Sequence, residues 1–165
     1  ALINLPSGEG FIAPYEGERA GDPSQTEGLI PVFCTKHKET VLFTVKQNRI
    51  SCVDGPARSA RHFNDLFEVD AARRNIAELG LGCNDAAVVW GNVLEDEKAG
   101  FHWAFGRSEH IGGITGPECF TDPGHVIHSD VVYALQCPIH IKSMDIINDS
   151  GVTDSVIRDG VYTVF

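Results

Sequence analysis

The stretch that decides the fold is His125-Val126-Ile127-His128-Ser129-Asp130-Val131-Val132-Tyr133. It is rich in β-branched residues and follows Pro123-Gly124, so it predicts a buried strand. Side chains alternate between the two faces of a strand, so His128 and Asp130 point the same way, with Cα atoms roughly 7 Å apart. Burying an unpaired carboxylate is costly. The pair is therefore either hydrogen-bonded at a strand end or bound to a metal ion.

The composition fits one globular domain over residues 1–165, because 42% of the residues are hydrophobic and 22% are charged. The net charge of −10 argues against binding of nucleic acid through its phosphates. No apolar run approaches the ~20 residues of a membrane span, and no signal peptide opens the chain. The five scattered cysteines indicate reduced thiols. We therefore expect a cytoplasmic protein without a membrane partner.

The pattern along the chain predicts an α+β fold, with a mostly antiparallel sheet or a partly open barrel and one or two helices. The amphipathic spacing of apolar residues predicts a helix over 57–69, and 92–98 is expected to form a short acidic helix or turn. The predicted strands are a short one near Phe11, then 28–33, 41–46, 50–53, 86–91, 99–106, 125–133, 138–145 and 151–165.

Three further residues of the metal-ligand type stand in unusual surroundings. Glu9 lies between two glycines, where the backbone can approach another group closely, although a solvated loop carboxylate fits as well. Glu78 interrupts an apolar run, so it is either paired with Arg73 or Arg74 or held by a metal. His102 lies on an aromatic strand, where a lone histidine is usually a satisfied core residue.

These residues with His128 and Asp130 form a set of carboxylates and imidazoles, which suits Zn, Mn, Co or Fe(II). Three carboxylates and two histidines can hold two ions that share one carboxylate and activate a water between them. His102, His128 and Asp130 alone also have the composition of the 2-His-1-carboxylate triad of non-haem Fe(II) oxygenases. The spacing along the chain does not separate these two interpretations.

Several motifs in register resemble the thermophilic metalloprotease family, the leucyl aminopeptidases of the aminopeptidase T and aminopeptidase S kind. The motifs are Asn4-Leu5-Pro6-x-Gly8-Glu9-x-Phe11-x-Ala13-Pro14, Asn75-Ile76-Ala77-Glu78-Leu79-Gly80-x-Gly82-x-Asn84, Gly91-Asn92-Val93-Leu94-Glu95-Asp96-Glu97-Lys98, His102-x-Ala104-Phe105-Gly106 and His128-x-Asp130. The resemblance covers nearly the whole chain and implies the fold of the C-terminal domain of such proteins. Chains of that family are about twice as long, with an α/β domain ahead of this one. Because the chain also begins at Ala1, without a methionine, we expect a fragment or a processed chain.

The resemblance implies that five residues bind two divalent ions (Zn, Co or Mn), with Glu78 as the bridging carboxylate. The five implied ligands are Glu9, Glu78, His102, His128 and Asp130. The family has a tyrosine a few residues after the histidine of the His-x-Ala-Phe-Gly motif, where this sequence offers Glu109 or His110. We expect Glu109, or another carboxylate nearby, to be the catalytic proton carrier.

Three functions follow from these expectations. The first is a metal-dependent aminopeptidase-like hydrolase that acts on a peptide or small-molecule substrate. The second is an Fe(II) ring-cleaving dioxygenase, since the resemblance extends to 2,5-dihydroxypyridine dioxygenase, which is expected to use only the two histidines and the aspartate. The third is a non-catalytic binding domain. An apolar face left exposed where a preceding domain would dock predicts a homo-oligomer, such as a dimer.

Overall fold

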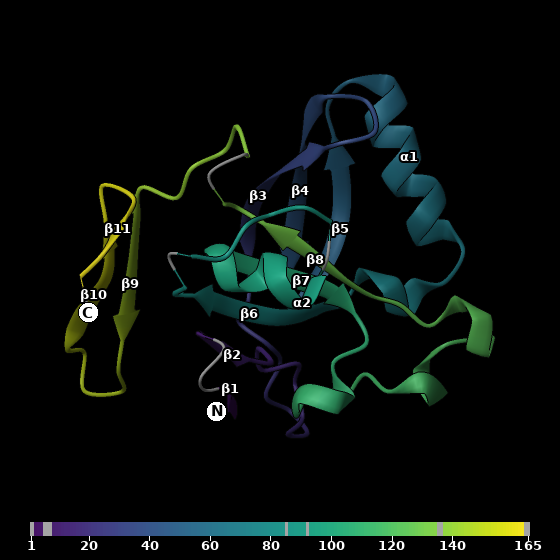
Figure 1. Ribbon diagram of the computed structural model, residues 1–165. Coiled ribbons are helices and arrows are strands. Elements are labelled where there is room, and N and C mark those ends of the chain that lie inside the picture. Colours follow the sequence, from purple (N-terminus) through teal and green to yellow (C-terminus); the bar gives the residue numbers. More distant parts are fainter. Residues whose placement is uncertain (1, 5–7, 85, 92, 135–136, 164–165) are drawn as a thin grey trace.

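A five-stranded antiparallel sheet, here called sheet A, forms the centre of the computed structural model (Figure 1). The structure describes residues 2–4, 8–84, 86–91, 93–134 and 137–163. In spatial order, sheet A consists of β1 (Leu2–Asn4), β2 (Glu9–Ile12), β6 (Ile76–Gly82), β7 (Phe101–Gly106) and β8 (His128–Val132). One face of this sheet packs on the hydrophobic core, and the other carries the polar residues of interest.

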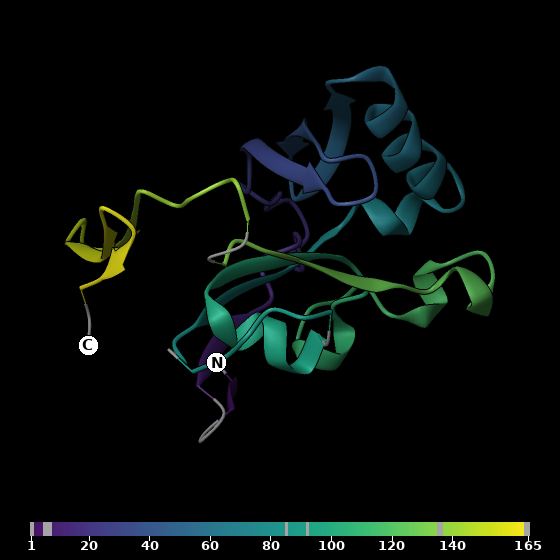
Figure 2. The same ribbon diagram turned by 45° about the horizontal axis from the view of Figure 1, so that its top comes forward.

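The core lies between sheet A, a second sheet and the long helix. Sheet B consists of β3 (Gly28–Cys34), β4 (Glu39–Lys46) and β5 (Arg49–Asp54), and the helix is α1 (Ala57–Glu68). Phe43 is fully buried and contacts the rings of Phe63 and Phe67 on α1 and of Trp103 on β7. Figure 2 shows the resulting layers, with sheet B and α1 above sheet A and short helical segments below it.

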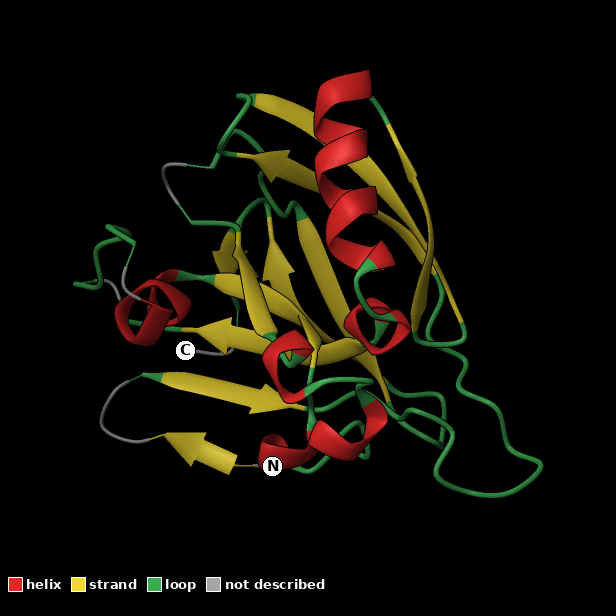
Figure 3. Ribbon diagram, turned by 90° about the vertical axis from the view of Figure 1, so that its right-hand side faces the viewer, coloured by secondary structure: helices red, strands yellow, loops and turns green. Residues whose placement is uncertain are grey.

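The short helical segments cover the opposite face of sheet A and its ends. They are α2 (Val93–Asp96) and the 3-10 turns η1 (Ala71–Arg74), η2 (Glu97–Ala99), η3 (Glu109–Ile111), η4 (Pro117–Cys119) and η5 (Pro123–His125). In Figure 3, α1 is the one long helix and runs beside the strands of sheet B. It has 12 residues, and no described helix is long and apolar enough to cross a membrane.

The C-terminal strands form a third antiparallel sheet, sheet C, set to one side of sheet A in Figures 1 and 2. Its strands are β9 (Ser143–Ile147), β10 (Thr153–Arg158) and β11 (Val161–Tyr162). The hydroxyl of Tyr162 donates a hydrogen bond to the Gly82 carbonyl at 2.8 Å, which ties sheet C to the end of β6.

The structure confirms the predicted α+β class, with mostly antiparallel strands and no closed barrel among the described residues. The predicted strand over 86–91 is wrong. That segment forms a loop in which Val88 and Trp90 are exposed, and the Asp96 carboxylate accepts the N–H groups of Trp90 and Gly91. Apolar composition misled here, because the preceding strand β6 already pairs on both edges with β2 and β7, so the segment that follows it cannot pair with β6.

The predicted strand boundaries also shift. The stretch over 125–133 becomes a strand only at His128, since Pro123–His125 forms η5. The first strand of the predicted C-terminal pair lies at Ser143–Ile147, later than the predicted 138–145, and the second, predicted over 151–165, is divided into β10 and β11. Proline at the first position of η5 favours a helical turn, which delays the strand.

Two buried asparagines join sheets A and B. The amide of Asn48 donates to Asn75 Oδ1 at 3.0 Å and to the Ile76 carbonyl at 2.8 Å. The amide of Asn75 donates to the Gly106 carbonyl at 3.1 Å, at the end of β7. Asn48 has a positive φ of 63°, as the tight turn between β4 and β5 requires, and asparagine tolerates this conformation. These bonds fix the start of β6, which carries Glu78.

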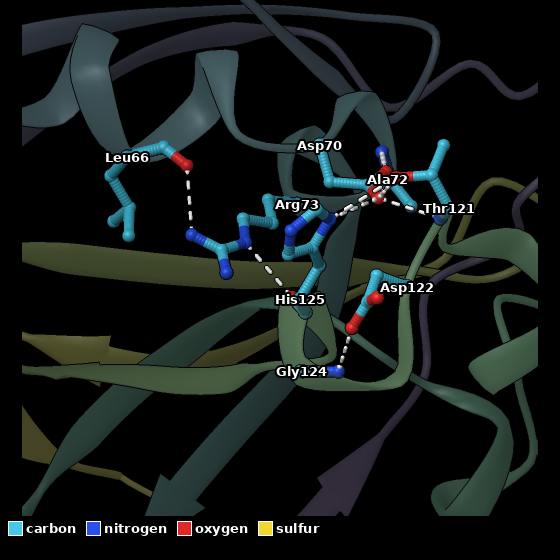
Figure 4. Close-up of polar contacts among 8 residues, drawn as sticks. All are labelled: Leu66, Asp70, Ala72, Arg73, Thr121, Asp122, Gly124 and His125. Atoms are coloured by element: carbon cyan, nitrogen blue, oxygen red, sulfur yellow. Dashed lines mark hydrogen bonds and ion pairs between the residues drawn. The ribbon is translucent and has the colours of Figure 1, made fainter.

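A polar network around Asp70 fixes the segment that leads into β8 (Figure 4). The Asp70 carboxylate accepts hydrogen bonds from the N–H and the hydroxyl of Thr121, both at 2.7 Å, and from the Ala72 N–H at 3.1 Å. The ring of His125 lies 3.3 Å from the same carboxylate. The guanidinium of Arg73 donates to the His125 carbonyl at 2.9 Å. The segment of Asp70 and η1, which follows α1, therefore sets the position at which β8 begins.

We predict that this network makes the fold sensitive to acid. The hydrogen bonds from the Thr121 hydroxyl and N–H hold the pKa of Asp70 well below its usual range. A lowered folded-state pKa stabilises the fold above the unfolded pKa of about 3.9, and this contribution is lost as pH falls through the folded-state pKa. Asp70→Asn should therefore lower the melting temperature at pH 7 and flatten its decline below pH 4, as measured by circular dichroism. Asp149→Asn, on an exposed turn, is the control. Equal acid profiles for Asp70→Asn and the wild-type chain would contradict this role.

Candidate metal centre

The five predicted ligands lie on four neighbouring strands of sheet A. Strand β2 supplies Glu9, β6 supplies Glu78, β7 supplies His102, and β8 supplies His128 and Asp130. Ala104 of β7 stands opposite Glu78 on one side and Asp130 on the other. Because directly opposite residues share a face, the two carboxylates flank a small side chain on the face away from the aromatic core. His128 and Asp130 thus point to the same face of β8, as the alternation of side chains along a strand predicts.

Glycines in β6 leave the space that the centre occupies. A Cβ at Gly80 would lie 1.9 Å from Nε2 of His102, whose ring therefore lies across this glycine. A Cβ at Gly82 would lie 2.3 Å from the Glu97 carbonyl oxygen, so the backbone of η2 also rests on a position without a side chain. Glycine within a strand often marks such a close approach. The Gly-x-Gly of β6 therefore admits both His102 and the segment that carries Glu97.

The carboxylate of Glu78 lies between the two histidines. Its Oε1 lies 3.3 Å from Nε2 of His102, and its Oε2 lies 3.1 Å from Nε2 of His128. Glu78 is buried, with 5% of its surface exposed, and His102 is fully buried. Each oxygen of one carboxylate thus faces a different imidazole.

The suggested pairing of Glu78 with Arg73 or Arg74 is wrong. Arg73 donates to the carbonyls of Leu66 and His125, and Arg74 donates to the Ile50 carbonyl at 3.0 Å. Both arginines lie in η1, and their acceptors are backbone carbonyls of α1, β5 and η5. The partners of Glu78 among the described residues are the two histidines.

Both histidines are oriented by backbone carbonyls. Nδ1 of His102 lies 3.1 Å from the Gly100 carbonyl, and Nδ1 of His128 lies 2.7 Å from the Arg107 carbonyl. A carbonyl only accepts hydrogen bonds, so each Nδ1 carries the proton and each Nε2 faces the carboxylates. Metal-binding histidines typically donate their second ring N–H to a carbonyl or carboxylate in this way. The orientation of both rings fits ligands that bind through Nε2.

Ligand-type atoms fall into two groups of three, and within each group all atoms lie within 4.8 Å of one another. One group comprises Glu9, Glu97 and His102, and the other comprises Glu78, His128 and Asp130. Oδ1 of Asp130 is buried and accepts no hydrogen bond from the described residues, and Nε2 of His128 is 3.5 Å away. A buried carboxylate oxygen without a donor fits a site for a cation. The structure therefore brings all five predicted ligands together.

Glu97 is the residue that the sequence analysis missed. It belongs to the acidic run 92–98, which was expected to form a short acidic helix or turn and which the family resemblance includes as a motif without a ligand role. The structure places it, through η2, beside Glu9 and His102. The signal that could have found it is Gly82, because a glycine in a strand indicates that another backbone comes close. That backbone is the one of Glu97 and Lys98.

The charges of the cluster shift the pKa of its members in opposite directions. Burial opposes ionisation of Glu78, but hydrogen bonds with His102 and His128 outweigh it and lower its pKa to about 2. Burial also opposes a charge on His128, yet the ion pair with Asp130 and the hydrogen bond with Glu78 raise its pKa to about 10. Burial, then the charges of Glu9 and Asp130, raise the pKa of Glu97 to about 7. The carboxylates of the cluster thus favour protonation of Glu97 and His128. An excess of negative charge of this kind also suits a metal cation.

Glu109 and His110 lie beside this cluster in different ways. The Glu109 carboxylate is half exposed and accepts a hydrogen bond from the Arg107 guanidinium at 2.6 Å. The ring of His110 meets the ring of His128 edge-on, with centroids 4.7 Å apart. Of the two residues considered for the tyrosine position, His110 has the direct contact with a cluster residue. The role of Glu109 as a proton carrier stays a prediction.

We predict that Gly80 is required for the position of His102. Gly80→Ala places a methyl group where the imidazole lies, so the ring must move and the unfolding free energy should fall by roughly 1–3 kcal/mol. The His102 ring resonances in an NMR spectrum should shift as well. Gly10→Ala on β2 is the matched control, since nothing lies within 4 Å of a Cβ there. Similar stability and unchanged His102 resonances in both variants would contradict the close packing.

Comparisons with known proteins support the fold. No protein-family profile matches the chain, and no curated protein matches it. Among solved structures, wild-type AmpT from Thermus thermophilus is similar, with a TM-score of 0.61 and 18% sequence identity over 94% of this chain. The chain spans 39% of the length of that AmpT chain. The fold expected from the family resemblance is therefore confirmed.

Proposed function

We propose that the chain is the metal-binding domain of an aminopeptidase-related hydrolase that holds two divalent ions. The observation that carries this proposal is the position of Glu78, whose two oxygens face histidines that belong to different groups of ligand-type residues. A carboxylate in that position can bind one ion with each oxygen. The likeness of the fold to AmpT and the sequence resemblance to aminopeptidases T and S support the same class of reaction.

The donor set fits Zn, Mn or Co. The two groups supply four carboxylates and two imidazoles, which are ligands for these ions. Glu9, Glu97 and His102 would hold one ion, and His128 with Asp130 would hold the other, with Glu78 shared. A pair of such ions polarises a carbonyl and lowers the pKa of a bound water. The protein's own contribution is to orient both imidazoles through the Gly100 and Arg107 carbonyls and to exclude water from Glu78.

Proton transfer is assigned to the residues beside the cluster. A hydrolase that cleaves a peptide bond must deliver a proton to the leaving amine, and a nearby carboxylate or imidazole can do this. Glu109 is our candidate for the proton carrier, as expected from the sequence. His110 lies against the ring of His128. We assign it to the wall of the site, where its imidazole can contact the substrate.

The arrangement favours two ions over a single iron. A mononuclear dioxygenase site would gather His102, His128 and Asp130 around one ion, but the two histidines fall into different groups, with Glu78 between them. The same triad would leave Glu9, Glu78 and Glu97 without a ligand role. A ring-cleaving dioxygenase and a non-catalytic binding domain are therefore the outcomes that the experiment below must exclude.

We predict that Glu78→Gln abolishes the binding of one or both ions. The wild-type chain, loaded with Zn, Mn or Co and desalted, should retain about two equivalents by elemental analysis. It should also release leucine from a leucyl peptide. Glu78→Gln should lower the metal content by at least one equivalent and the hydrolysis rate by at least about 100-fold. Glu68→Gln, on the exposed face of α1, is the control.

Three results would contradict the proposal. Less than one equivalent of metal in the wild-type chain, together with no effect of Glu78→Gln, would remove the dinuclear site. Oxygen uptake with a dihydroxylated pyridine after anaerobic iron loading, with no peptide hydrolysis, would favour the dioxygenase. Metal binding without either reaction would support a binding domain.

A further inference from the structure

Strand β8 forms a free edge of sheet A. It pairs only with β7 among the described strands. The Tyr133 N–H donates to the Phe101 carbonyl at 2.9 Å, and the Arg107 N–H donates to the Ile127 carbonyl at 2.7 Å. Hydrogen-bonding direction alternates along an antiparallel strand, so the backbone groups of residues 128, 130 and 132 point away from β7. An edge of this kind is a template for another extended chain.

A cavity of about 460 Å³ follows this edge. Four consecutive residues of β8, Ser129 to Val132, line it, which means that it runs along the backbone edge and is not confined to one face of the strand. The opposite wall comes from β3 and α1, including Cys34 and Phe63, and Val89 lines it from the loop before α2. Its volume lies within the range of small-molecule and short-peptide sites.

The cavity is lined by charged side chains of both signs. Lys36 and Lys38, from the turn between β3 and β4, line it together with His62. Asp130 is the only carboxylate among the described lining residues, and it also belongs to the metal cluster. In a chain of net charge −10, a lining with two lysines and one carboxylate is locally basic, which suits a ligand that carries a carboxylate.

We propose that this cavity, here called the β8 groove, binds a short peptide as an added strand along β8, with its C-terminal carboxylate at Lys36 and Lys38. The free N–H and C=O groups of the strand pair with the peptide backbone, as in other cases of strand addition. The two lysines of the lining attract a carboxylate, and the C-terminus is where a short apolar peptide carries one. Naming this peptide as the substrate rests on the proposed hydrolase function; the binding itself does not.

The groove can be tested by direct binding, without turnover. The probe is the peptide Ala-Val-Ala-Val with a free C-terminus, titrated into the ¹⁵N-labelled, chelator-treated chain. Its NMR amide shifts should change most at residues 129–132. The double variant Lys36→Ala/Lys38→Ala should raise the Kd about fivefold. Lys46→Ala, an exposed lysine at the other end of β4 that does not line the groove, should leave the Kd unchanged.

Two modified peptides separate the two kinds of contact. The C-terminal amide should bind the wild-type chain as weakly as the free acid binds the double variant, and it should not respond to the lysine substitutions. A peptide N-methylated at alternate residues, which removes the N–H groups that face β8, should lose the shifts at 129–132. Equal binding of the N-methylated and unmodified peptides, or shifts that map away from β8, would overturn the proposal.

The same peptide, incubated with the metal-loaded chain, distinguishes this inference from the proposed function. Shifts at residues 129–132 without hydrolysis would support the groove and count against the hydrolase. Hydrolysis without those shifts, and with an unchanged KM in the lysine double variant, would support the hydrolase and remove the groove as its substrate site.

Discussion

The buried carboxylate of Glu78 between two imidazoles is the constraint on which the rest of this site depends. A buried charge is stable only with partners of opposite charge or strong donors. Here both partners come from the same side of β6, His102 from the adjacent strand β7 and His128 from β8, one strand further. Three neighbouring strands must therefore keep their register for one side chain to remain satisfied. The pairing of β6 with β7 and of β7 with β8 is thus a requirement of this cluster as well as of the sheet.

One face of sheet A packs in the hydrophobic core, and the other carries the ligand-type residues. On one face, aromatic residues pack against sheet B and α1, and this core holds the strands in place. On the other, small residues leave room: Gly80 beneath the His102 ring, Gly82 beneath the backbone of η2, and Ala104 between the carboxylates of Glu78 and Asp130. Larger side chains there would improve the core-like packing but would fill the space that the ligands need. The buried asparagines and the Asp70 network then set where β6 and β8 begin.

Local pattern in the sequence accounts for much of this structure. The alternation around His128 and Asp130 predicts their shared face, and the apolar spacing over 57–69 predicts α1. Alternation also places His102 on the face opposite Trp103, although the residues next to His102 in the sequence do not reveal that its partner is Glu78 on β6.

Three features could not be predicted from the sequence. The segment 86–91 has the composition of a strand, but β6 has no free edge for it. Glu78 stands close in sequence to Arg73 and Arg74, yet strand direction carries it away from them. Glu97 lies in an ordinary acidic run, and only the glycine beneath its backbone marks it.

The most direct measurement of the central claim, that Glu78 joins two ions, is anomalous scattering from crystals of the chain soaked in Zn or Mn. Two peaks about 3.5–4 Å apart are expected, one near Glu9, Glu97 and His102, and the other near His128 and Asp130, with an oxygen of Glu78 bound to each. A single peak bound by both histidines and Asp130, with Glu78 outside its coordination, would contradict the claim.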